Sequence, residues 1–403
     1  MTLRYLAPAG SPMSAVDLAR WLGVGLSAPS APDALAAALA TRFGVRHVFL
    51  ASTGRAGLTV MLRAMRRLRP ERTDVVVPGY TCYSVPASIV KAGLRPRFVD
   101  IEPATLGYAP GALAAIDHRQ TLAIMATNLY GLPDDLPAIE RLAHEQGAFL
   151  IDDAAQAMGA TVGGRWSGTW GDAGLFSFDK GKNVSAIDGG AIVTQADDLA
   201  SALAEEMAGL ESPGLGATGA HIAKALVYFA MLRPSLYGIP ARIPQLGLGR
   251  TEFTLDFPLA RPDRALSALG VTMLPHLDAF TTARRANAAA ILDAVAGVRQ
   301  FSAITPLPGS APAWLRLPLL APDTRARDAA IAALTAAGIG ATGSYPAALA
   351  DVAPLRDLVA NPDAPLPGAR DVAARILTLP THPFVTAGDI TRMAATLARV
   401  VGR

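Results

Sequence analysis

Short apolar runs alternate with alanine-rich helical stretches through the first half of this chain, and the alternation is the strongest constraint on its fold. A strand followed by a turn or loop is predicted at each of six runs, at 47–53, 74–79, 95–101, 121–131, 148–156 and 190–195. Helices are predicted at 56–68 and 87–93. The pattern is typical of an α/β fold built on a mostly parallel sheet.

The second half continues with a predicted long helix over 275–300 and then a separate α/β module. This module has a predicted strand at 314–320, a helix at 323–338 and a final helix over about 388–401. A chain of 403 residues, 51% of them hydrophobic, is long enough for two cores. We therefore predict a large domain at 1–260 and a smaller C-terminal domain at 261–403.

Composition disfavours several classes of protein. The net charge of +3 comes from excess arginine, and no basic tract alternates with aromatic residues, so we expect no nucleic-acid partner. Cys82 is the only cysteine, which rules out an internal disulfide and a CxxC metal cluster and fits a reducing cytoplasm. The segment 1–13 lacks the charged start and continuous apolar core of a signal peptide, so we expect none, and no run reaches the roughly 18–20 apolar residues that span a bilayer. We expect a soluble, cytoplasmic protein without a metal.

Segments suited to chemistry fall at the ends of predicted strands, where open α/β sheets bind ligands. They are "STGRAG" (52–57), "PGYTCY" (78–83), "NLYG" (128–131) and "DDAAQ" (152–156). The first is a small turn that enters a helix, and its free N–H groups and helix dipole suit a phosphate. This turn is not a P-loop, and no GxGxxG pattern opens the first unit, so ATP hydrolysis and a dinucleotide cofactor are disfavoured.

The stretch "LIDDAAQAMGA" (150–160) places Asp152 and Asp153 just past an apolar strand, with Gln156 three residues after Asp153. A carboxylate at such a place is costly unless it has a cationic partner. One such partner is the protonated ring nitrogen of pyridoxal phosphate (PLP), whose role as an electron sink requires that proton. A helix N-cap is the open alternative.

The stretch "LFSFDKGKNVSAIDGG" (175–190) holds two of the four lysines in the chain, Lys180 and Lys182. A Schiff-base lysine must reach a carbonyl from a restrained loop, and an arginine cannot form an imine. Ser177 lies five residues before Lys182, where its hydroxyl could bind the same phosphate as the turn at 52–57. A solvated pair of charges remains the alternative.

Taken in order, these segments resemble one family. They are "STGRAGL", "VVVPGYTCYSVPASIVKAGLRPRFVDIEPATL", "NLYGLPDDL", the run 150–194, and the late "SYP" and "LPTHP". The chain is similar to the DegT-type (DegT/DnrJ/StrS) sugar aminotransferases, strongly over 35–200 and weakly over 205–260. The resemblance implies a fold-type I PLP-transferase fold, PLP as cofactor and a homodimer, in enzymes that usually aminate nucleotide-linked ketosugars.

The same resemblance implies roles on the cofactor side. Lys182 resembles the Schiff-base lysine of the pattern Ser-Phe-x-x-x-Lys-Asn, and Lys180 then occupies a variable position that tunes charge or meets substrate. Asp153 resembles the aspartate that pairs with the pyridinium nitrogen, and Gln156 resembles the residue beside the ring and its 3-hydroxyl. Three positions match the phosphate cradle: the amides of Gly54 and Arg55 and the hydroxyl of Ser177.

The chain departs from the family pattern at two cofactor positions. Arg55 stands where the family commonly has threonine, and an arginine could hold the phosphate bidentately or reach toward an acidic substrate. Cys82 stands where a Phe or Trp normally stacks on the pyridine ring. Either flanking tyrosine, Tyr80 or Tyr83, is expected to stack instead, unless the thiol simply packs there.

The substrate side departs further. Of the family signature Asn-x-Arg-x-Ser-Glu only Arg261 is in register, and the histidine that often follows Tyr-Pro is absent after Tyr345. His382 in "LPTHP" matches the family, as either a structural or a functional residue. We expect Arg261, Tyr345, His382 and Lys180 on the substrate side. The pattern predicts the same cofactor chemistry on an altered substrate.

The resemblance is weakest around an apolar insert at 221–249. Large apolar residues lie nearly side by side over 226–232, so a helix here would be apolar around most of its circumference. We expect the insert to border the active-site mouth and to select a bulky hydrophobic acceptor through Phe229 and Leu232. Added core, a dimer interface and, with the least support, membrane contact are the alternatives.

The residues and the resemblance together imply an aminotransferase. Glutamate is the expected donor, and the acceptor is nominally a nucleotide-linked ketosugar or a more hydrophobic intermediate. Dehydration, elimination or cyclisation with the same cofactor is an alternative, but family dehydratases replace the lysine at Lys182. A non-catalytic, PLP-binding regulatory protein is a second alternative, which the complete set at 153, 156, 177 and 182 disfavours.

Overall fold

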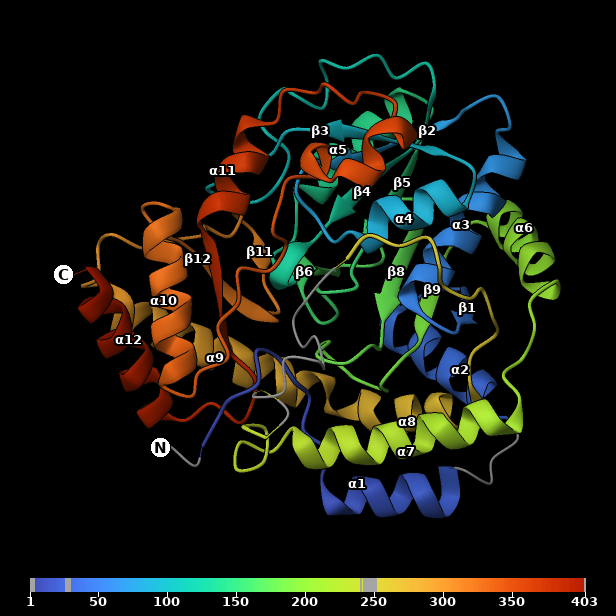
Figure 1. Ribbon diagram of the computed structural model, residues 1–403. Coiled ribbons are helices and arrows are strands. Elements are labelled where there is room, and N and C mark those ends of the chain that lie inside the picture. The colour runs from blue at the N-terminus through green and yellow to red at the C-terminus, as the bar shows by residue number, and fades with distance from the viewer. Residues whose placement is uncertain (1–3, 26–29, 240, 242–251, 402–403) are drawn as a thin grey trace.

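The computed structural model describes residues 4–25, 30–239, 241 and 252–401. At its centre lies a seven-stranded sheet in the order β1-β9-β8-β5-β4-β2-β3 (Figure 1). The strands are β1 (His47–Ala51), β2 (Asp74–Pro78), β3 (Arg95–Val99), β4 (Thr121–Thr127), β5 (Phe149–Asp153), β8 (Ala173–Ser177) and β9 (Gly190–Thr194). β9 pairs antiparallel with β1 and β8, and the other neighbours pair in parallel. The predicted α/β fold with a mostly parallel sheet is confirmed.

Strand β8 is the one strand of this sheet that the apolar pattern does not predict. Its sequence "AGLFS" contains a glycine, which strands usually avoid because it offers no side chain to pack. A Cβ on Gly174 would lie 1.8 Å from the carbonyl oxygen of Gly168. The backbone of that loop therefore packs directly on the strand, and only glycine fits. The strand ends at Ser177, just before the lysine segment.

Helices cover both faces of the large sheet. On one face α3 (Gly54–Leu68) packs with α4 (Ser84–Lys91) and α6 (Asp197–Ala208). On the other, α2 (Ala31–Phe43) packs on β1 and on α8 (Arg264–Met273), and α5 (Leu136–Glu145) packs on β4 and β5. Side chains of β9 alternate between the two layers, because Ile192 joins the core with α3 whereas Val193 joins the core with α2 and α8.

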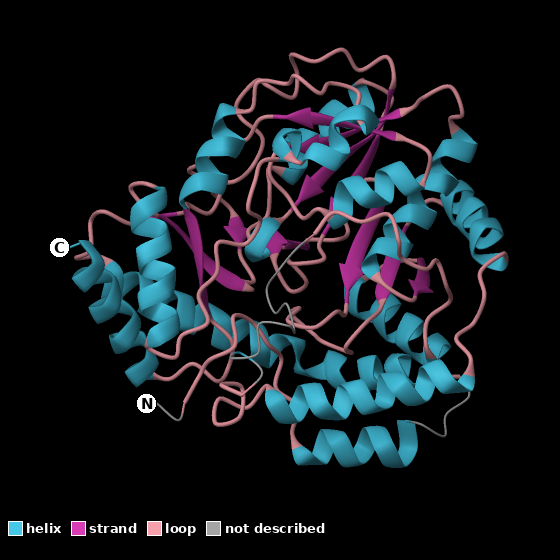
Figure 2. Cartoon of the chain, viewed as in Figure 1, coloured by secondary structure: helices cyan, strands magenta, loops and turns pink. Residues whose placement is uncertain are grey.

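The C-terminal part has its own antiparallel sheet, which stands apart from the large one in Figure 2. It contains β10 (Ser302–Ala303), β12 (Arg316–Leu320) and β13 (Ile376–Pro380). Its helices are α9 (Leu277–Val295), α10 (Thr324–Ala336), α11 (Pro367–Arg375) and α12 (Ala387–Val401). The predicted elements at 275–300, 314–320, 323–338 and 388–401 are confirmed, whereas the sequence pattern does not predict β13.

Short elements complete the chain and join its parts. In a third sheet, β6 (Thr161–Val162) lies between β11 (Ser310–Ala311) and β7 (Arg165–Trp166) and pairs with both. The short helices are α1 (Ala15–Arg20), η1 (Trp21–Gly25), η2 (Leu129–Gly131), η5 (Leu274–His276), η6 (Leu349–Asp351) and η7 (Ala353–Leu358). Helix α8 follows position 260 in the chain yet packs on α2 of the large sheet. The domain boundary at 260/261 therefore stays a prediction.

The apolar insert contributes most of α7 (Leu215–Met231), which lies along α8 (Figure 1). Phe229 is 8% exposed and packs in the core with α8, and Leu232 is 2% exposed and packs against Gly10. The expectation that these two side chains face an acceptor is wrong, because both are buried among protein atoms. Positions 240 and 242–249 of the insert lie outside the described residues. None of the helices in the described ranges has the length and hydropathy that crossing a bilayer requires.

Candidate active site

A cavity of about 450 Å³, the main cavity, opens where β5 and β8 end and α3 begins. A second cavity of about 190 Å³, the side cavity, shares several lining residues with it. Predicted site residues gather here: Gly54, Arg55, Cys82, Asp153, Ser177, Lys180 and Lys182 line the main cavity, and Gln156 and Tyr345 line the side cavity. The fold thus brings most of the predicted cofactor residues into one place.

The two adjacent aspartates at the end of β5 have different surroundings. Asp152 is fully buried and accepts hydrogen bonds from Asn128 Nδ2 (2.7 Å) and from the N–H groups of Gly168 (2.5 Å) and Trp170 (3.2 Å). Burial raises the pKa of Asp152 to about 7. Side chains alternate along a strand, so Asp152 turns away from the face that its neighbour uses. Its contacts anchor the loop at 168–170.

Asp153 instead lines the main cavity together with Lys182. Its Oδ1 accepts a hydrogen bond from the N–H of Ala155 at 3.0 Å. Burial raises the pKa of Asp153, and the charge of Lys182 opposes that shift. The chain after Asp153 forms turns rather than a helix, so the N-cap alternative is wrong. The carboxylate therefore faces a cavity in which the Lys182 ammonium provides the opposite charge.

The phosphate turn is shaped by close backbone packing. Helix α3 begins at Gly54, and the hydroxyl of its N-cap Thr53 accepts a hydrogen bond from the N–H of Ala56 at 2.9 Å. A Cβ on Gly54 would lie 3.3 Å from Ser177 Oγ, and a Cβ on Gly190 would lie 2.8 Å from the nitrogen of Gly54. Glycine therefore keeps the helix N-terminus and the Ser177 hydroxyl close together, in an arrangement suited to an anion.

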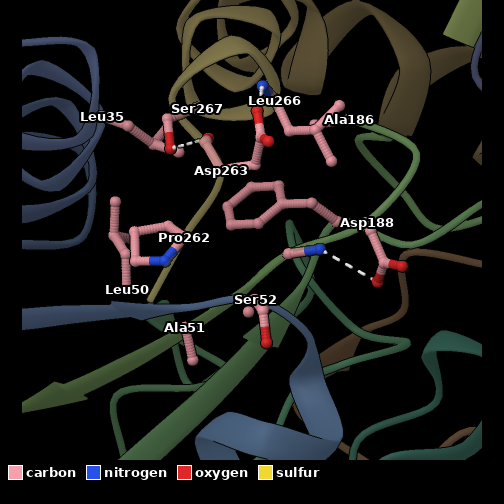
Figure 3. Close-up of a pocket in the computed structure, with 13 residues that line it drawn as sticks. Leu35, Leu50, Ala51, Ser52, Ala186, Asp188, Pro262, Asp263, Leu266 and Ser267 are labelled. Carbon is pink, nitrogen blue, oxygen red and sulfur yellow. Dashed lines mark hydrogen bonds between the residues drawn. The ribbon is translucent and has the colours of Figure 1, made fainter. Parts of the chain in front are cut away.

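A much smaller cavity, of about 20 Å³, lies behind this turn and is drawn in Figure 3. Ser52 and Asp188 line it, and the Gly189 N–H donates a hydrogen bond to Asp188 Oδ1 at 3.2 Å. Burial, and then the charge of Asp179, raise the pKa of Asp188. The volume of this small cavity suits no more than a water molecule, so the cavity is not a cofactor site.

The backbone of Lys182 is held from the far side by a buried arginine and a serine. Ser11 Oγ donates to the Lys182 carbonyl at 2.7 Å. Arg284 is fully buried and donates to the carbonyls of Asn183 (3.2 Å) and Gly10 (2.8 Å), and burial lowers its pKa to about 10. Sequence reasoning missed both Ser11 and Arg284, because they are distant in the chain and lie in stretches without a motif.

The side cavity adds a hydrogen-bonded network at the edge of the site. Gln156 Nε2 donates to the hydroxyl of Tyr345 at 3.0 Å, and Gln156 Oε1 accepts from the N–H of Tyr130 at 3.0 Å. Arg316, which no sequence motif marks, lines the same cavity. A guanidinium stays charged at neutral pH, so Arg316 supplies a positive charge beside Tyr345.

Cys82 occupies the position at which the family normally has a stacking aromatic residue. It lines both cavities, and its Sγ accepts a hydrogen bond from Ser84 Oγ at 3.0 Å. Tyr83 does not line either cavity, and its hydroxyl accepts from the N–H of Ala347 at 3.0 Å. The expected replacement of the stacking ring by Tyr83 is therefore not supported by the structure.

Three predicted site residues line neither cavity, so their contact with cofactor or substrate stays a prediction. Tyr80 is buried, with its ring centre 5.5 Å from that of Tyr345. His382 is buried with Nε2 at 2.9 Å from the carbonyl of Ala7, and burial lowers its pKa to about 4. Arg261 Nε donates to a backbone carbonyl on the neighbouring loop at 3.1 Å. All three hold surrounding segments in place.

Comparison with known proteins identifies the class. The sequence profile of the DegT/DnrJ/EryC1/StrS aminotransferase family matches residues 26–244 and 259–398, so the chain belongs to this family. The chain is also 29% identical over 372 residues to a UDP-N-acetyl-3-dehydro-alpha-D-glucosamine 3-aminotransferase of Acidithiobacillus ferrooxidans, and the match spans 91% of this chain and 88% of that protein.

Solved structures share the fold over nearly the whole chain. DesI, determined in the presence of its TDP-sugar product, has a TM-score of 0.78 at 25% identity and covers 100% of this chain and 94% of its own. The E. coli GDP-4-keto-6-deoxy-D-mannose-3-dehydratase, determined with bound hydrated PLP, has a TM-score of 0.78 at 19% identity. The match covers 98% of this chain and 100% of that chain. The family is one of PLP-dependent enzymes.

The residues of the main cavity fit PLP. The phosphate would lie at the N-terminus of α3 beside Ser177, where a Cβ on Gly54 would narrow the cradle. A buried carboxylate, Asp153, is available for a protonated ring nitrogen, and Lys182 provides the amine that an aldehyde requires.

Proposed function

We propose that this aminotransferase moves an amino group from glutamate to a ketone carbonyl of a nucleotide-linked sugar, with PLP as its cofactor. The observation that carries the proposal is that Asp153 and Lys182 line one cavity together with the N-terminus of α3. The activity named for the relative from A. ferrooxidans, which acts on a UDP-linked sugar, supports the class of acceptor. The resemblance of the chain to the family supports glutamate as the donor.

The chain's own residues divide the work of such a reaction. When bound, PLP supplies an electron sink that stabilises negative charge on a substrate carbon. Asp153 holds the proton on the ring nitrogen, and its burial strengthens that attraction. Lys182 Nζ takes the proton from the reacting carbon and returns it as general base and then acid. The amides of Gly54 and Arg55 bind the phosphate with the hydroxyl of Ser177.

Arg316 is the residue we propose for the carboxylate of the donor. Arg316 lines the side cavity together with Gln156, Tyr345 and Lys182, and Lys182 also lines the main cavity. A guanidinium can hold a carboxylate through two parallel hydrogen bonds, which fixes orientation as well as position. A donor held there has its amino group directed toward the main cavity.

Reconstitution with PLP followed by addition of donors tests the proposal. The protein should gain the visible absorbance of lysine-bound cofactor, and borohydride reduction should fix the cofactor on Lys182. Glutamate should then remove the absorbance, and a keto acceptor should restore it. A reduced adduct on Lys180, or a protein that stays colourless with excess PLP, would contradict the assignment.

Two other functions would give different results in the same assay. A dehydratase or eliminase would release a dehydrated product without consuming an amino donor, and Lys182 disfavours it because family dehydratases replace that lysine. A regulatory protein would bind PLP and keep its absorbance with every donor. We also propose a homodimer, as the resemblance implies, and light scattering of the holoprotein tests that state.

A further inference from the structure

Lysine is rare in this chain and gathers at the candidate active site. Three of the four lysines, Lys180, Lys182 and Lys224, line the main cavity. The fourth, Lys91, places its ammonium 4.5 Å from the ring centre of Phe257, a ring that the Arg55 guanidinium also approaches at 5.0 Å. The proposed function uses only Lys182 as an amine, so the positions of Lys180 and Lys224 need another explanation.

Lys180 and Lys224 reach the cavity from two different elements. Lys180 lies in the loop after β8, and Lys224 lies on α7 within the insert. The helix docks on the loop directly, because the Gly181 N–H donates a hydrogen bond to the hydroxyl of Tyr228 at 3.1 Å. Partial burial lowers the pKa of Lys224, and the neighbouring charge of Lys180 lowers it further. The packing of α7 therefore brings Lys224 to the cavity that Lys180 also lines.

Two adjacent ammonium groups repel each other unless an anion lies between them. Asp179 and Asp188 line the same cavity, and their charges offset part of this repulsion. Asp179 lies 3.9 Å from Lys180, but no carboxylate in the described ranges lies within 4.0 Å of Lys224. Asp188 accepts a hydrogen bond from a backbone N–H, and Glu252 lines the cavity without an ion pair to either lysine among the described residues. Lys224 thus has no direct ion-pair partner among the described residues, and an external anion can take that place beside Lys180.

We propose that Lys180 and Lys224 form an anion-binding pair at the mouth of the main cavity, which holds a phosphate or carboxylate group of the keto acceptor. This inference rests on the proposed function, since it takes the acceptor to enter here. Lys224 is exposed and lies on the added helix, whereas the phosphate cradle for PLP lies at Gly54 and Ser177. The insert then contributes a charge to substrate selection rather than an apolar wall.

Titration calorimetry of inorganic pyrophosphate binding to the PLP-loaded protein tests whether the two lysines bind an anion. Lys180→Met and Lys224→Met should each weaken pyrophosphate binding by about tenfold to a hundredfold, the usual effect of losing a charge-assisted contact. Lys224→Arg should stay within about threefold of the wild type, because a guanidinium also binds phosphate. Arg20→Met removes an exposed positive charge from α1 and is the matched control, with no change expected.

The donor reaction identifies which substrate carries the anion. Lys224→Met should retain PLP and react with glutamate at the wild-type rate and concentration. Three results would each overturn the inference. Weaker glutamate binding would assign the pair to the donor, and loss of PLP would assign it to the cofactor phosphate. Pyrophosphate binding that is equal in all the proteins, or absent from all of them, would show that the two lysines form no anion site. If the wild type does not react with glutamate, the proposed function fails, while the pyrophosphate comparison still decides about the pair.

Discussion

The main cavity has two walls that are built in different ways. The cofactor wall, Gly54, Arg55, Asp153, Ser177 and Lys182, is formed by the ends of β5 and β8, the start of α3 and the loop that follows β8. The entrance wall, Lys180, Lys224 and Glu252, comes from that same loop, from α7 and from the segment after the insert. The sheet ladder positions most of the first wall, whereas a helix docked on its surface positions much of the second.

This difference explains how substrate and cofactor sites can change separately. Residues at strand ends are held by hydrogen bonds on both sides, so a shift there disturbs the whole sheet. Helix α7 contacts the cavity loop through the Tyr228 hydroxyl, and it exposes much of its outer face, including Val227 at 61%. Replacing side chains on such a helix changes what the entrance recognises with little effect on the sheet. The following predictions test this separation, beginning with the largest effect.

Substitutions of Lys182 and Lys180, in the loop after β8, should differ most in their effect on activity if only the cofactor wall carries out the chemistry. Lys182→Ala should abolish the visible absorbance of bound cofactor and lower transamination by about 10⁴-fold, the upper range for loss of a general acid–base group. Lys180→Met should keep the absorbance. Spectra and single-turnover rates with glutamate measure both. Equal losses in the two variants would erase the distinction between the walls.

The insert offers a buried and an exposed apolar side chain two positions apart. Phe229→Ser should lower the free energy of unfolding by about 3–5 kcal/mol, because it empties part of the core against α8. Val227→Ser, on the exposed face, should change it by less than about 0.5 kcal/mol. Urea titration measures both. A stable Phe229→Ser protein with a raised Michaelis constant for its acceptor would restore the hydrophobic-acceptor hypothesis.

Substitutions of the adjacent aspartates should also differ, with a loss of turnover at Asp153 and little change in turnover at Asp152. Asp153→Asn should retain PLP yet lower turnover by about 10²–10³-fold, as expected when a preorganised electrostatic partner is lost. Asp152→Asn removes an acceptor of backbone N–H groups, and its turnover per folded molecule should stay near the wild-type value. Steady-state rates normalised to cofactor content test the pair. The reverse ranking would move the ring-nitrogen role to Asp152.

Replacement of Arg55, also in the cofactor wall, should have a smaller effect. Its side chain packs 5.0 Å from the ring centre of Phe257, and its backbone amide lies in the phosphate turn. Arg55→Ala should weaken PLP retention by about tenfold to a hundredfold if the guanidinium also holds the phosphate. Arg55→Lys is the control for charge alone. Unchanged retention with weaker acceptor binding would place Arg55 in the entrance wall.

The last expected effect is a pH dependence of stability from Asp152. Burial raises its pKa in the folded protein to about 7, above the unfolded value near 3.8. Between these values the folded state binds more protons than the unfolded state, so the free energy of unfolding falls as pH rises from about 4 to 7. The slope is at most about 1.4 kcal/mol per pH unit. Urea unfolding at pH 5 and pH 8 should show a smaller change in Asp152→Asn than in the wild type.

Much of the cofactor wall could be predicted because its signals are local. Apolar runs bounded by turn residues indicate strands, and parallel strand ends meet at one edge of a sheet, so the sequence pattern places the two aspartates at 152–153 and the phosphate turn together. The resemblance to the family then singles out Asp153. Strands β8 and β13 escape this reasoning. Gly174 interrupts the apolar run of β8. Glycine is required there because the Gly168 carbonyl packs against it, and that contact cannot be read from the strand's own sequence.

Local sequence patterns predicted most of the strands and helices in their order along the chain, and the motifs predicted the family and the candidate residues for PLP binding. The folded chain adds what these patterns do not contain: Asp153 lines the cavity whereas Asp152 is buried behind it, Lys224 also lines it, and Tyr80, Arg261 and His382 do not. The reason is physical. Secondary structure follows the periodicity of nearby residues, whereas burial and charge pairing depend on elements that packing brings together from distant parts of the chain.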